Sequence, residues 1–266
     1  MDFCSIASGS SGNCIYVGSE NHSVLIDAGI SCKRITEGLR GIGRSPADLD
    51  AVLVTHEHSD HISGLGVMSR RYHIPIYSTP ATARQIRRYA PLGKLDEDLF
   101  HDIEADLVFE IGDLSVRAFR ISHDAADPVA YRIECGGKAA AVATDMGTYS
   151  RYTLDHLQNL DAVLVEANHD ENMLQVGPYP YYLKCRIAGD KGHLSNTAAG
   201  DLLAQILNDH MKAAFLGHLS QTNNYAALAY ATVISQITLN EHCPYKEGDI
   251  PVLVAKREEP MELMNF

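Results

Sequence analysis

The sequence lacks several features that would place it in a special class of protein. No apolar run approaches the roughly 18 residues that span a bilayer, so we expect no transmembrane helix. The first residues, 1–5, carry no basic stretch and no apolar core, so we expect no signal peptide. The 6 cysteines are scattered without a C-x-x-C pair, which argues against a disulfide framework and favours reduced thiols in a cytoplasmic protein.

Internal repeats, low-complexity segments and proline- or serine-rich linkers are also missing. The chain has 266 residues, of which 45% are apolar and 21% charged, and this composition is ordinary for a folded protein. It excludes a disordered, collagen-like or coiled-coil chain. A chain of this length can bury a core without disulfides, and we predict a single domain over residues 1–266.

Charge of one sign predominates, but unevenly. The net charge is −12, which by itself argues against a nucleic-acid partner. Residues 31–94, however, hold ten Lys and Arg against five Asp and Glu. Bound cations would offset part of the acidic excess elsewhere. The 13 histidines, several beside carboxylates, are the most unusual feature that the chain does have.

The pattern of apolar residues predicts alternating strands and helices. Short apolar runs separated by glycine- and serine-rich turns predict β-hairpins in the first thirty residues. Later strands are predicted at 50–55, 107–109, 114–119, 129–134, 139–144, 161–166, 213–216 and 251–254, and helices at 32–42, 62–72, 80–89, 195–207 and 224–236. This order predicts a layered α/β structure with helices outside the sheets.

The strongest chemical signal is the H-x-H-x-D-H run that follows the predicted strand 50–55. It places His56, His58, Asp60 and His61 within six residues. A loop fed by a buried strand can project such side chains into one cavity. Neutral imidazoles and a carboxylate are ligands that zinc and similar divalent ions prefer. The run therefore predicts a metal site rather than a solvated polar loop.

Three further candidate ligands also follow predicted strands. His123 comes after the strand 114–119, Asp145 after 139–144 and His218 after 213–216. A single histidine after a strand is more often structural than a ligand. The shared position of all three after apolar runs favours a common site at the ends of the strands.

Together these residues resemble the metallo-β-lactamase superfamily over nearly the whole chain. Segments 7–13, 166–170, 192–196 and 218–224 more narrowly resemble its WalJ (YycJ) branch, which is DNA exonuclease-like. Segments 166–168 and 192–195 are also similar to motifs of the tRNA 3′-processing endonucleases (tRNase Z). The resemblance implies a four-layer αββα sandwich of two mixed sheets flanked by helices, with the site at the sheet edges.

The resemblance also implies a site for two divalent metal ions. The first ion would be held by His56, His58 and His123, and the second by Asp60, His61 and His218, with Asp145 bridging the two. A carboxylate can join two cations about 3.5–4 Å apart, and a hydroxide held between them is available at neutral pH. The histidine-rich set favours zinc, with manganese or iron as alternatives.

Three residues are candidates for catalysis. Asp60 would orient the hydroxide as well as bind metal. In the related nucleases the residue that matches His193 assists the leaving group, and a histidine near a phosphate can do this as general acid. Glu166 would orient His193, by resemblance to the tRNA nucleases, although a structural role stays open.

Three more residues are candidates for substrate contact. The small residues of segment 8–13 would let the backbone approach a phosphate, which favours Ser10 and Asn13, although a tight turn would explain the segment equally well. His169 either contacts substrate or supports the metal ligands.

The predicted reaction is hydrolysis of phosphodiester bonds in DNA or RNA, with nucleic acid as the partner and no membrane. A small-molecule hydrolase acting on a thioester, lactone or cyclic phosphodiester is the first alternative, because the same ligands support those reactions. A non-catalytic signalling protein with the same fold is the second. The oligomeric state stays open, with a homodimer among the alternatives.

Overall fold

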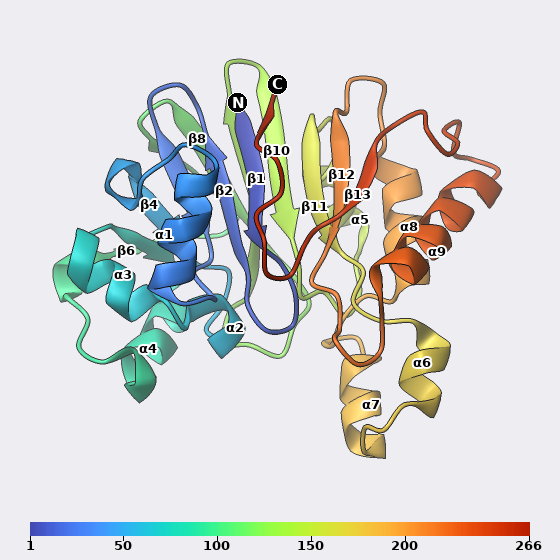
Figure 1. Ribbon diagram of the computed structural model, residues 1–266, viewed down its shortest axis with the longest axis horizontal. Coiled ribbons are helices and arrows are strands. Elements are labelled where there is room, and N and C mark those ends of the chain that lie inside the picture. Colours follow the sequence, from blue (N-terminus) through green and yellow to red (C-terminus); the bar gives the residue numbers. More distant parts are fainter. The chain divides into compact units, whose positions relative to one another are not determined.

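A computed structural model describes all residues from Met1 to Phe266 and contains two sheets of seven strands each, with helices beside them (Figure 1). The first sheet has the order β14-β1-β2-β3-β4-β5-β6 and the second β13-β12-β11-β10-β9-β8-β7. The strands of the first sheet are β1 (Asp2–Ala7), β2 (Cys14–Gly18), β3 (Ser23–Ile26), β4 (Ala51–Leu53), β5 (Ile76–Ser78), β6 (Phe100–Asp102) and β14 (Met264–Asn265). Those of the second are β7 (Val108–Ile111), β8 (Leu114–Arg120), β9 (Val129–Cys135), β10 (Lys138–Ala143), β11 (Ala162–Glu166), β12 (Ala213–Gly217) and β13 (Val252–Val254). The predicted fold class, two mixed sheets flanked by helices, is confirmed.

The helices fall mainly between the strands. The α-helices are α1 (Cys32–Gly41), α2 (Ser59–Ile62), α3 (Leu65–Tyr72), α4 (Pro80–Arg88), α5 (Arg151–His156), α6 (Glu171–Val176), α7 (Tyr181–Ile187), α8 (Asn196–Ile206) and α9 (Ala226–Leu239). Three short 3₁₀ helices are η1 (Pro46–Asp48), η2 (Ala90–Leu92) and η3 (Glu97–Leu99). None of the helices combines the length and the apolar character that a bilayer span requires.

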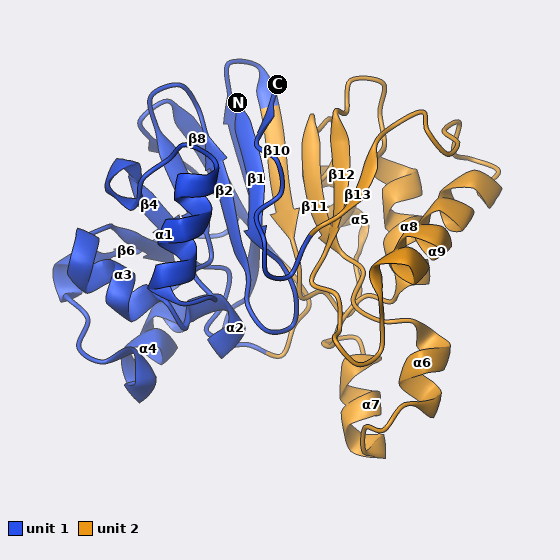
Figure 2. Ribbon diagram, in the orientation of Figure 1, with its two compact units in different colours: residues 1–120, 125–138, 256–266 blue, residues 121–124, 139–255 orange.

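The chain divides into two compact units (Figure 2). Unit 1 comprises residues 1–120, 125–138 and 256–266, and unit 2 comprises residues 121–124 and 139–255. The first sheet and strands β7 to β9 belong to unit 1, and the strands from β10 to β13 belong, from Ala139 onward, to unit 2. The single-domain organisation stays a prediction.

Unit 1 is built on the antiparallel strands β1, β2 and β3, which continue into the parallel strands β4, β5 and β6. Every residue of β1, β2 and β3 is buried, so these short apolar runs form the core rather than a solvated face. Helix α1 packs Ile35 and Leu39 into this core. Tyr131 on β9 donates its hydroxyl hydrogen to the Val54 carbonyl at 3.0 Å, which anchors the chain just after β4.

Unit 2 contains four parallel strands linked by helical crossovers, so the carboxyl ends of β10, β11 and β12 meet at one edge. Strands β11 and β12 are buried along their whole length, as expected for parallel strands covered on both faces. Helices α8 and α9 pack closely, because a Cβ on Gly200 would lie 2.5 Å from the Cβ of Gln236. This edge carries the candidate ligands of unit 2.

The prediction of one continuous helix over 62–72 is wrong. The chain forms α2 and α3 instead, separated at Ser63 and Gly64. The Gly64 N–H donates to the Ala28 carbonyl at 2.8 Å, and a Cβ at Gly64 would lie 2.0 Å from the Ile30 carbonyl oxygen. The close approach to the segment that follows β3 therefore breaks the helix. The sequence pattern also missed α5, α6 and α7, which are only six or seven residues long.

Candidate metal and catalytic site

In unit 1, four candidate ligands lie close together in the chain: His56 and His58 on the loop after β4, and Asp60 and His61 on α2. His56 and His61 are fully buried, whereas His58 and Asp60 are partly exposed. His56 Nε2 lies 3.1 Å from His58 Nδ1, and His61 Nε2 lies 3.6 Å from Asp60 Oδ2. Two nitrogens that each lie about 2.0–2.1 Å from a tetrahedral zinc ion are roughly 3.3 Å apart. Within each pair, the two atoms are therefore spaced as two ligands of one ion are.

The orientation of His61 is fixed by Asp27, which follows β3. Asp27 is buried, and its Oδ2 accepts a hydrogen bond from His61 Nδ1 at 2.7 Å. Thr55 also donates to Asp27, from its backbone N–H at 2.8 Å and from its hydroxyl. Burial raises the pKa of the Asp27 carboxyl, while the charge and hydrogen bond of His61 oppose that shift. With Nδ1 committed to Asp27, Nε2 is the ring nitrogen of His61 that would bind a metal.

The glycine- and serine-rich loop after β1 supports the same loop of unit 1. Asn13 is fully buried, and its Nδ2 lies 3.2 Å from His61 Nε2. Its backbone N–H donates to the Asp60 carbonyl at 2.9 Å. A Cβ on Gly29 would lie 1.7 Å from that carbonyl oxygen, so only glycine permits this approach. Asn13 thus contacts the candidate ligands, whereas Ser10 is exposed.

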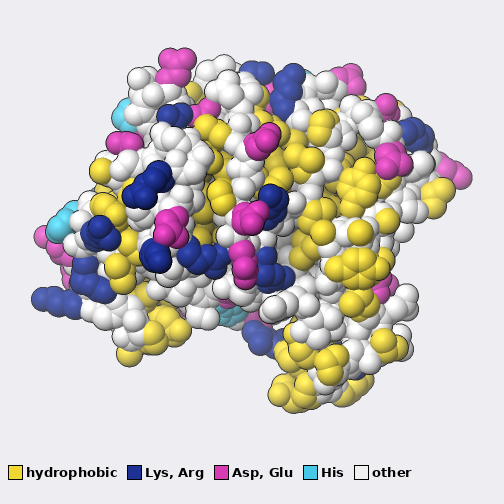
Figure 3. All heavy atoms as spheres, viewed as in Figure 1, with side chains coloured by type: hydrophobic (Ala, Val, Ile, Leu, Met, Phe, Trp, Pro, Cys, Tyr) yellow, Lys and Arg dark blue, Asp and Glu magenta, His cyan; other side chains and the backbone are white.

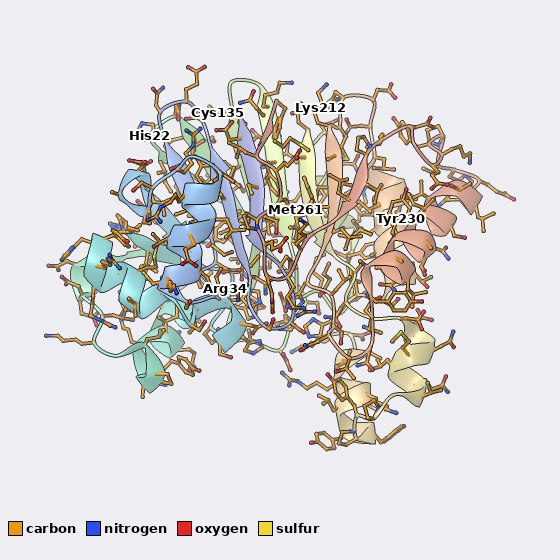
Figure 4. The ribbon with its side chains drawn as sticks, viewed as in Figure 1. His22, Arg34, Cys135, Lys212, Tyr230 and Met261 are labelled. Atoms are coloured by element: carbon orange, nitrogen blue, oxygen red, sulfur yellow. The ribbon has the colours of Figure 1, made fainter.

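Two arginines border the exposed part of this loop. Arg257 donates to the Ser11 hydroxyl at 3.1 Å, and its side chain packs against Gly9. Arg34 on α1 donates to the Arg257 carbonyl at 3.2 Å (Figure 4). The loop that carries Ser10 therefore lies beside positive charge.

In unit 2, the candidate residues gather at the carboxyl ends of three parallel strands. Asp145 follows β10, Glu166 ends β11 and His218 follows β12. Ligand atoms of Asp145, Glu166, His193 and His218 all lie within 4.8 Å of one another. Asp145 Oδ1 is 3.5 Å from His218 Nε2 and, on another side, 3.7 Å from His123 Nε2. A carboxylate between two imidazoles suits a bridging position.

His123, His193 and His218 of unit 2 contact a protein acceptor through the same ring nitrogen, Nδ1, as His61 does in unit 1. His123 Nδ1 lies 3.1 Å from the Gly192 carbonyl oxygen. His193 Nδ1 and His218 Nδ1 lie 3.1 Å and 3.2 Å from Glu166 Oε2. Each ring gives its Nδ1 hydrogen to a protein acceptor, which leaves Nε2 to bind a metal or a substrate.

Glu166 is the acceptor that organises two of these rings. It is fully buried, and its Oε1 accepts the Leu194 backbone N–H at 3.1 Å. Burial alone would raise the pKa of Glu166, but the charge of His193 and the hydrogen bonds from His193 and His218 lower it to about 2. Burial lowers the pKa of His193, yet Glu166 and Asp145 outweigh it and raise that pKa. A buried carboxylate thus favours a protonated His193.

Backbone strain marks the same residues. Asp27, Asp145 and His218 have φ angles of 63°, 60° and 54°, in the left-handed region that non-glycine residues seldom occupy. Such strain persists where the surrounding structure enforces it, and it is concentrated at functional sites. Asp27 and His218 directly follow β3 and β12, and Asp145 lies two residues after β10, so the strained positions are at strand ends.

Two supporting residues escaped the sequence reasoning. Asp27 holds His61, and Asn168 donates from Nδ2 to the His218 carbonyl at 2.9 Å. Asp27 stands at the end of an apolar run, the same signal that identified Asp145, and could have been found by it. Asn168 has no such signal, because its role depends on contact with a residue 50 positions away.

His169 adjoins this group but differs from it. It is only 2% exposed, and its Nδ1 has no hydrogen-bond partner. Burial lowers the pKa of His169, which favours its neutral form. The imidazole therefore presents an unsatisfied polar atom within unit 2.

Unit 1 thus groups His56, His58, Asp60 and His61, and unit 2 groups His123, Asp145, Glu166, His193 and His218. The donor set and its spacing fit divalent metal ions in each unit. The pairing of these residues around two ions stays a prediction.

Comparison with known proteins agrees with this arrangement. Residues 22–218 match the family described as the β-lactamase superfamily domain. The chain is 41% identical over 232 residues to the exodeoxyribonuclease WalJ of Streptococcus pneumoniae, covering 87% of this chain and 86% of that protein. It is 36% identical over 233 residues to the exodeoxyribonuclease YycJ of Bacillus anthracis, with 88% of each chain covered.

Two solved structures show the same fold at low sequence identity. The metallo-β-lactamase fold protein YhfI of Bacillus subtilis aligns with a TM-score of 0.71 and 16% identity, covering 98% of both chains. The short form of human tRNase Z aligns with a TM-score of 0.65 and 15% identity, covering 100% of both chains. The sequence relatives, the shared fold and the histidine and aspartate residues at the strand ends all lead to one assignment: the chain belongs to the metallo-β-lactamase superfamily, in the branch that contains WalJ and YycJ.

Proposed function

We propose that the chain is a metal-dependent phosphodiester hydrolase that acts as an exonuclease on DNA. The observation that carries the proposal is the 41% identity to an exodeoxyribonuclease over 87% of this chain. The match covers 86% of that relative, so nearly all of its length has a counterpart here. The buried imidazoles and carboxylates described above supply groups that such a reaction needs.

We further propose two metal ions per chain. One would be held by His56, His58 and His123, the other by Asp60, His61 and His218, with Asp145 bridging them. Ligand-like separations of 3.1 to 3.7 Å within each unit support the assignment. Zinc is favoured by the histidine-rich set, with manganese or iron as alternatives. When bound, two such ions neutralise charge on the phosphate and supply a nucleophile at neutral pH.

His193 would protonate the leaving oxygen. Glu166 holds its Nδ1 hydrogen and stabilises the protonated ring, so Nε2–H faces away from Glu166 toward substrate. Glu166 acts as a positioning residue in this scheme, because it touches His193 rather than the substrate. Asp60 would orient the nucleophile as well as bind metal.

The loop after β1 would contact the DNA backbone. The exposed Ser10 hydroxyl lies in the loop next to Arg257, whose charge favours a phosphate. Buried Asn13 would fix the shape of that loop and its fit to His61. His169 would contact the substrate from unit 2. A cytoplasmic location belongs to the same proposal, as the free cysteines suggest.

The test is a substrate panel with the metal-loaded protein. Labelled single- and double-stranded DNA, RNA, bis(p-nitrophenyl) phosphate and a thioester are incubated in parallel, with chelator-treated protein as the control. The proposal expects mononucleotides released from DNA ends and no thioester hydrolysis. Preference for RNA would change the substrate class, and hydrolysis of the thioester alone would point to the small-molecule alternative. No turnover on any substrate would favour the signalling role.

A further inference from the structure

The segment from α6 to α7, residues 170–192, exposes apolar side chains. Val176, Tyr181 and Tyr182 have 82%, 82% and 75% of their surface exposed. The space-filling view shows hydrophobic side chains gathered over α6 and α7 (Figure 3). A contiguous exposed apolar patch marks a binding surface more often than an accident of folding.

A pocket of about 330 Å³ opens between the two helices. Its walls are mostly apolar and include Leu174, Tyr181, Cys185 and Ala188, with Lys184 among the lining residues. The volume is at the lower end of the roughly 300–1,000 Å³ found for small-ligand sites. The pocket is therefore suited to one small, largely apolar group.

The same pocket is lined by His169, the residue with an unsatisfied Nδ1. A buried polar atom without a partner costs stability, and such atoms are rare in native proteins. Because His169 is 2% exposed, solvent cannot supply the missing bond freely. The pocket thus combines apolar walls with one polar atom that needs a partner.

The pocket lies beside the catalytic residues of unit 2. Asn168, next to His169 in sequence, donates to the His218 carbonyl at 2.9 Å. At the other end of the segment, the backbone N–H of His193 donates to the carbonyl of Ile187, the last residue of α7, at 2.9 Å. The chain segments that line the pocket are therefore hydrogen-bonded, at each end, to the segments that carry His218 and His193.

We propose that this pocket binds one unpaired nucleobase of the DNA strand. The base would stack on the Tyr181 ring, and its edge would contact His169. Lys184 has three ammonium hydrogens, of which one bonds to the Gln175 carbonyl, and the others would meet a phosphate. An aromatic face with a neighbouring cation is the usual means of holding single-stranded nucleic acid. The inference rests on the proposed nuclease function and names the part of the substrate that the pocket recognises.

The thiol of Cys185 can report whether this pocket is occupied. Cys185 lines it and is exposed, whereas Cys4, Cys14, Cys32 and Cys243 are buried. Replacing the half-buried Cys135 with serine leaves Cys185 as the accessible thiol. The experiment measures the rate at which iodoacetamide alkylates Cys185 in the metal-loaded protein. Near saturation with deoxyadenosine 5′-monophosphate, we expect the rate to fall about tenfold, in proportion to occupancy.

The control ligand is 2-deoxyribose 5-phosphate, which has the sugar and phosphate without the base. It should slow the alkylation far less than the nucleotide does, because it lacks the base that stacks on Tyr181. Equal protection by both ligands would overturn base recognition. A rate that falls with protein concentration, together with a doubled mass in sedimentation, would show that a second copy covers the patch, and would also overturn the proposal.

A pair of tyrosines provides a matched test. Tyr181 lines the pocket and Tyr182 does not, although the two are about equally exposed. Titration calorimetry should show Tyr181→Ala binding the nucleotide roughly 5- to 150-fold more weakly, the range for loss of one stacking partner. Tyr182→Ala should bind as the unmodified protein does. Equal losses in both variants would refute the specific pocket.

His169→Leu tests the polar contact in the same titration, with the thermal unfolding midpoint measured to verify folding. A folded variant with unchanged affinity would exclude the contact between His169 and the base. The two proposals fail separately: cleavage of DNA without protection of Cys185 overturns only the pocket. Protection by the nucleotide without hydrolysis of any phosphodiester overturns only the proposed function.

Discussion

The candidate ligands of the two units are organised in opposite ways. In unit 1, His56, His58, Asp60 and His61 lie within six residues, on the loop after β4 and on the short helix α2. In unit 2, the candidates between His123 and His218 come from segments spread over nearly a hundred residues. The first group depends on one turn of chain, and the second depends on the alignment of three parallel strands.

Their supports differ as well. Unit 1 holds His61 Nδ1 through the carboxylate of Asp27, which also accepts two bonds from Thr55, while Asn13 contacts the other ring nitrogen. Unit 2 holds His218 through Glu166 and Asn168 together. We infer that the local motif is the more vulnerable to loss of one support, and that the strand-end group is the more vulnerable to loss of its central carboxylate.

The largest effect is expected from Asp145, the carboxylate at the centre of unit 2. Asp145→Ala should abolish measurable phosphodiesterase activity and lose one metal ion per chain, because two close cations would lose their bridge. Elemental analysis and the DNA assay measure both. Asp145→Asn keeps a side chain that tolerates the left-handed backbone and should fail similarly. Exposed Asp155→Ala is the control, and wild-type turnover in Asp145→Ala would place the bridge elsewhere.

The next effect concerns His193, which the proposal places at the leaving group. His193→Ala should retain both metals and cleave DNA about 10²–10⁴-fold more slowly. The defect should be small for bis(p-nitrophenyl) phosphate, whose leaving group departs without a proton. The informative quantity is the ratio of the two rate defects, taken with metal content. Equal defects with the metals intact would contradict the leaving-group role, and metal loss would make His193 a ligand.

The next prediction tests Asp27, the carboxylate that supports His61 in unit 1. Asp27→Asn keeps a residue that tolerates φ near 63° but removes the charge that orients His61. Loss of such a partner lowers metal affinity about 10–100-fold, and we expect this for the ion bound by His61. Metal-buffered titration measures the change. Asp106→Asn is matched in backbone, with φ of 71°, and lies in an exposed turn, so its affinity should not change.

The smallest effect is expected from Asn168, one of two supports in unit 2. Asn168→Ala removes the donor to the His218 carbonyl and should destabilise the fold by about 1–3 kcal/mol. Because Glu166 still holds the His218 ring, metal affinity should fall less than in Asp27→Asn. Asn208→Ala removes a similar bond, to the Leu160 carbonyl, away from the site. It should cost stability without changing metal affinity, and a larger metal defect in Asn168→Ala than in Asp27→Asn would reverse the comparison.

Much of the fold could be read from local patterns. The apolar runs that became β2, β4, β10, β11 and β12 are buried on both faces, so their composition identifies them without alternation. Ser195, where the helix over 195–207 was predicted to begin, accepts the Ala198 backbone N–H and caps α8. Helices α6 and α7 could not be predicted, because a short, exposed helix has too few buried apolar residues to show the helical spacing in the sequence.

The sequence by itself determined the superfamily and the identity of the candidate ligands, because four of them form one short motif and the rest follow buried strands. Only the tertiary structure decided what supports them. Asp27, Asn13 and Asn168 act through hydrogen bonds to residues 34, 48 and 50 positions away, and no local pattern encodes such distances. The pocket at His169 has the same origin. It exists because α6 and α7 fold against each other over a buried imidazole, and packing rather than spacing leaves that nitrogen without a partner.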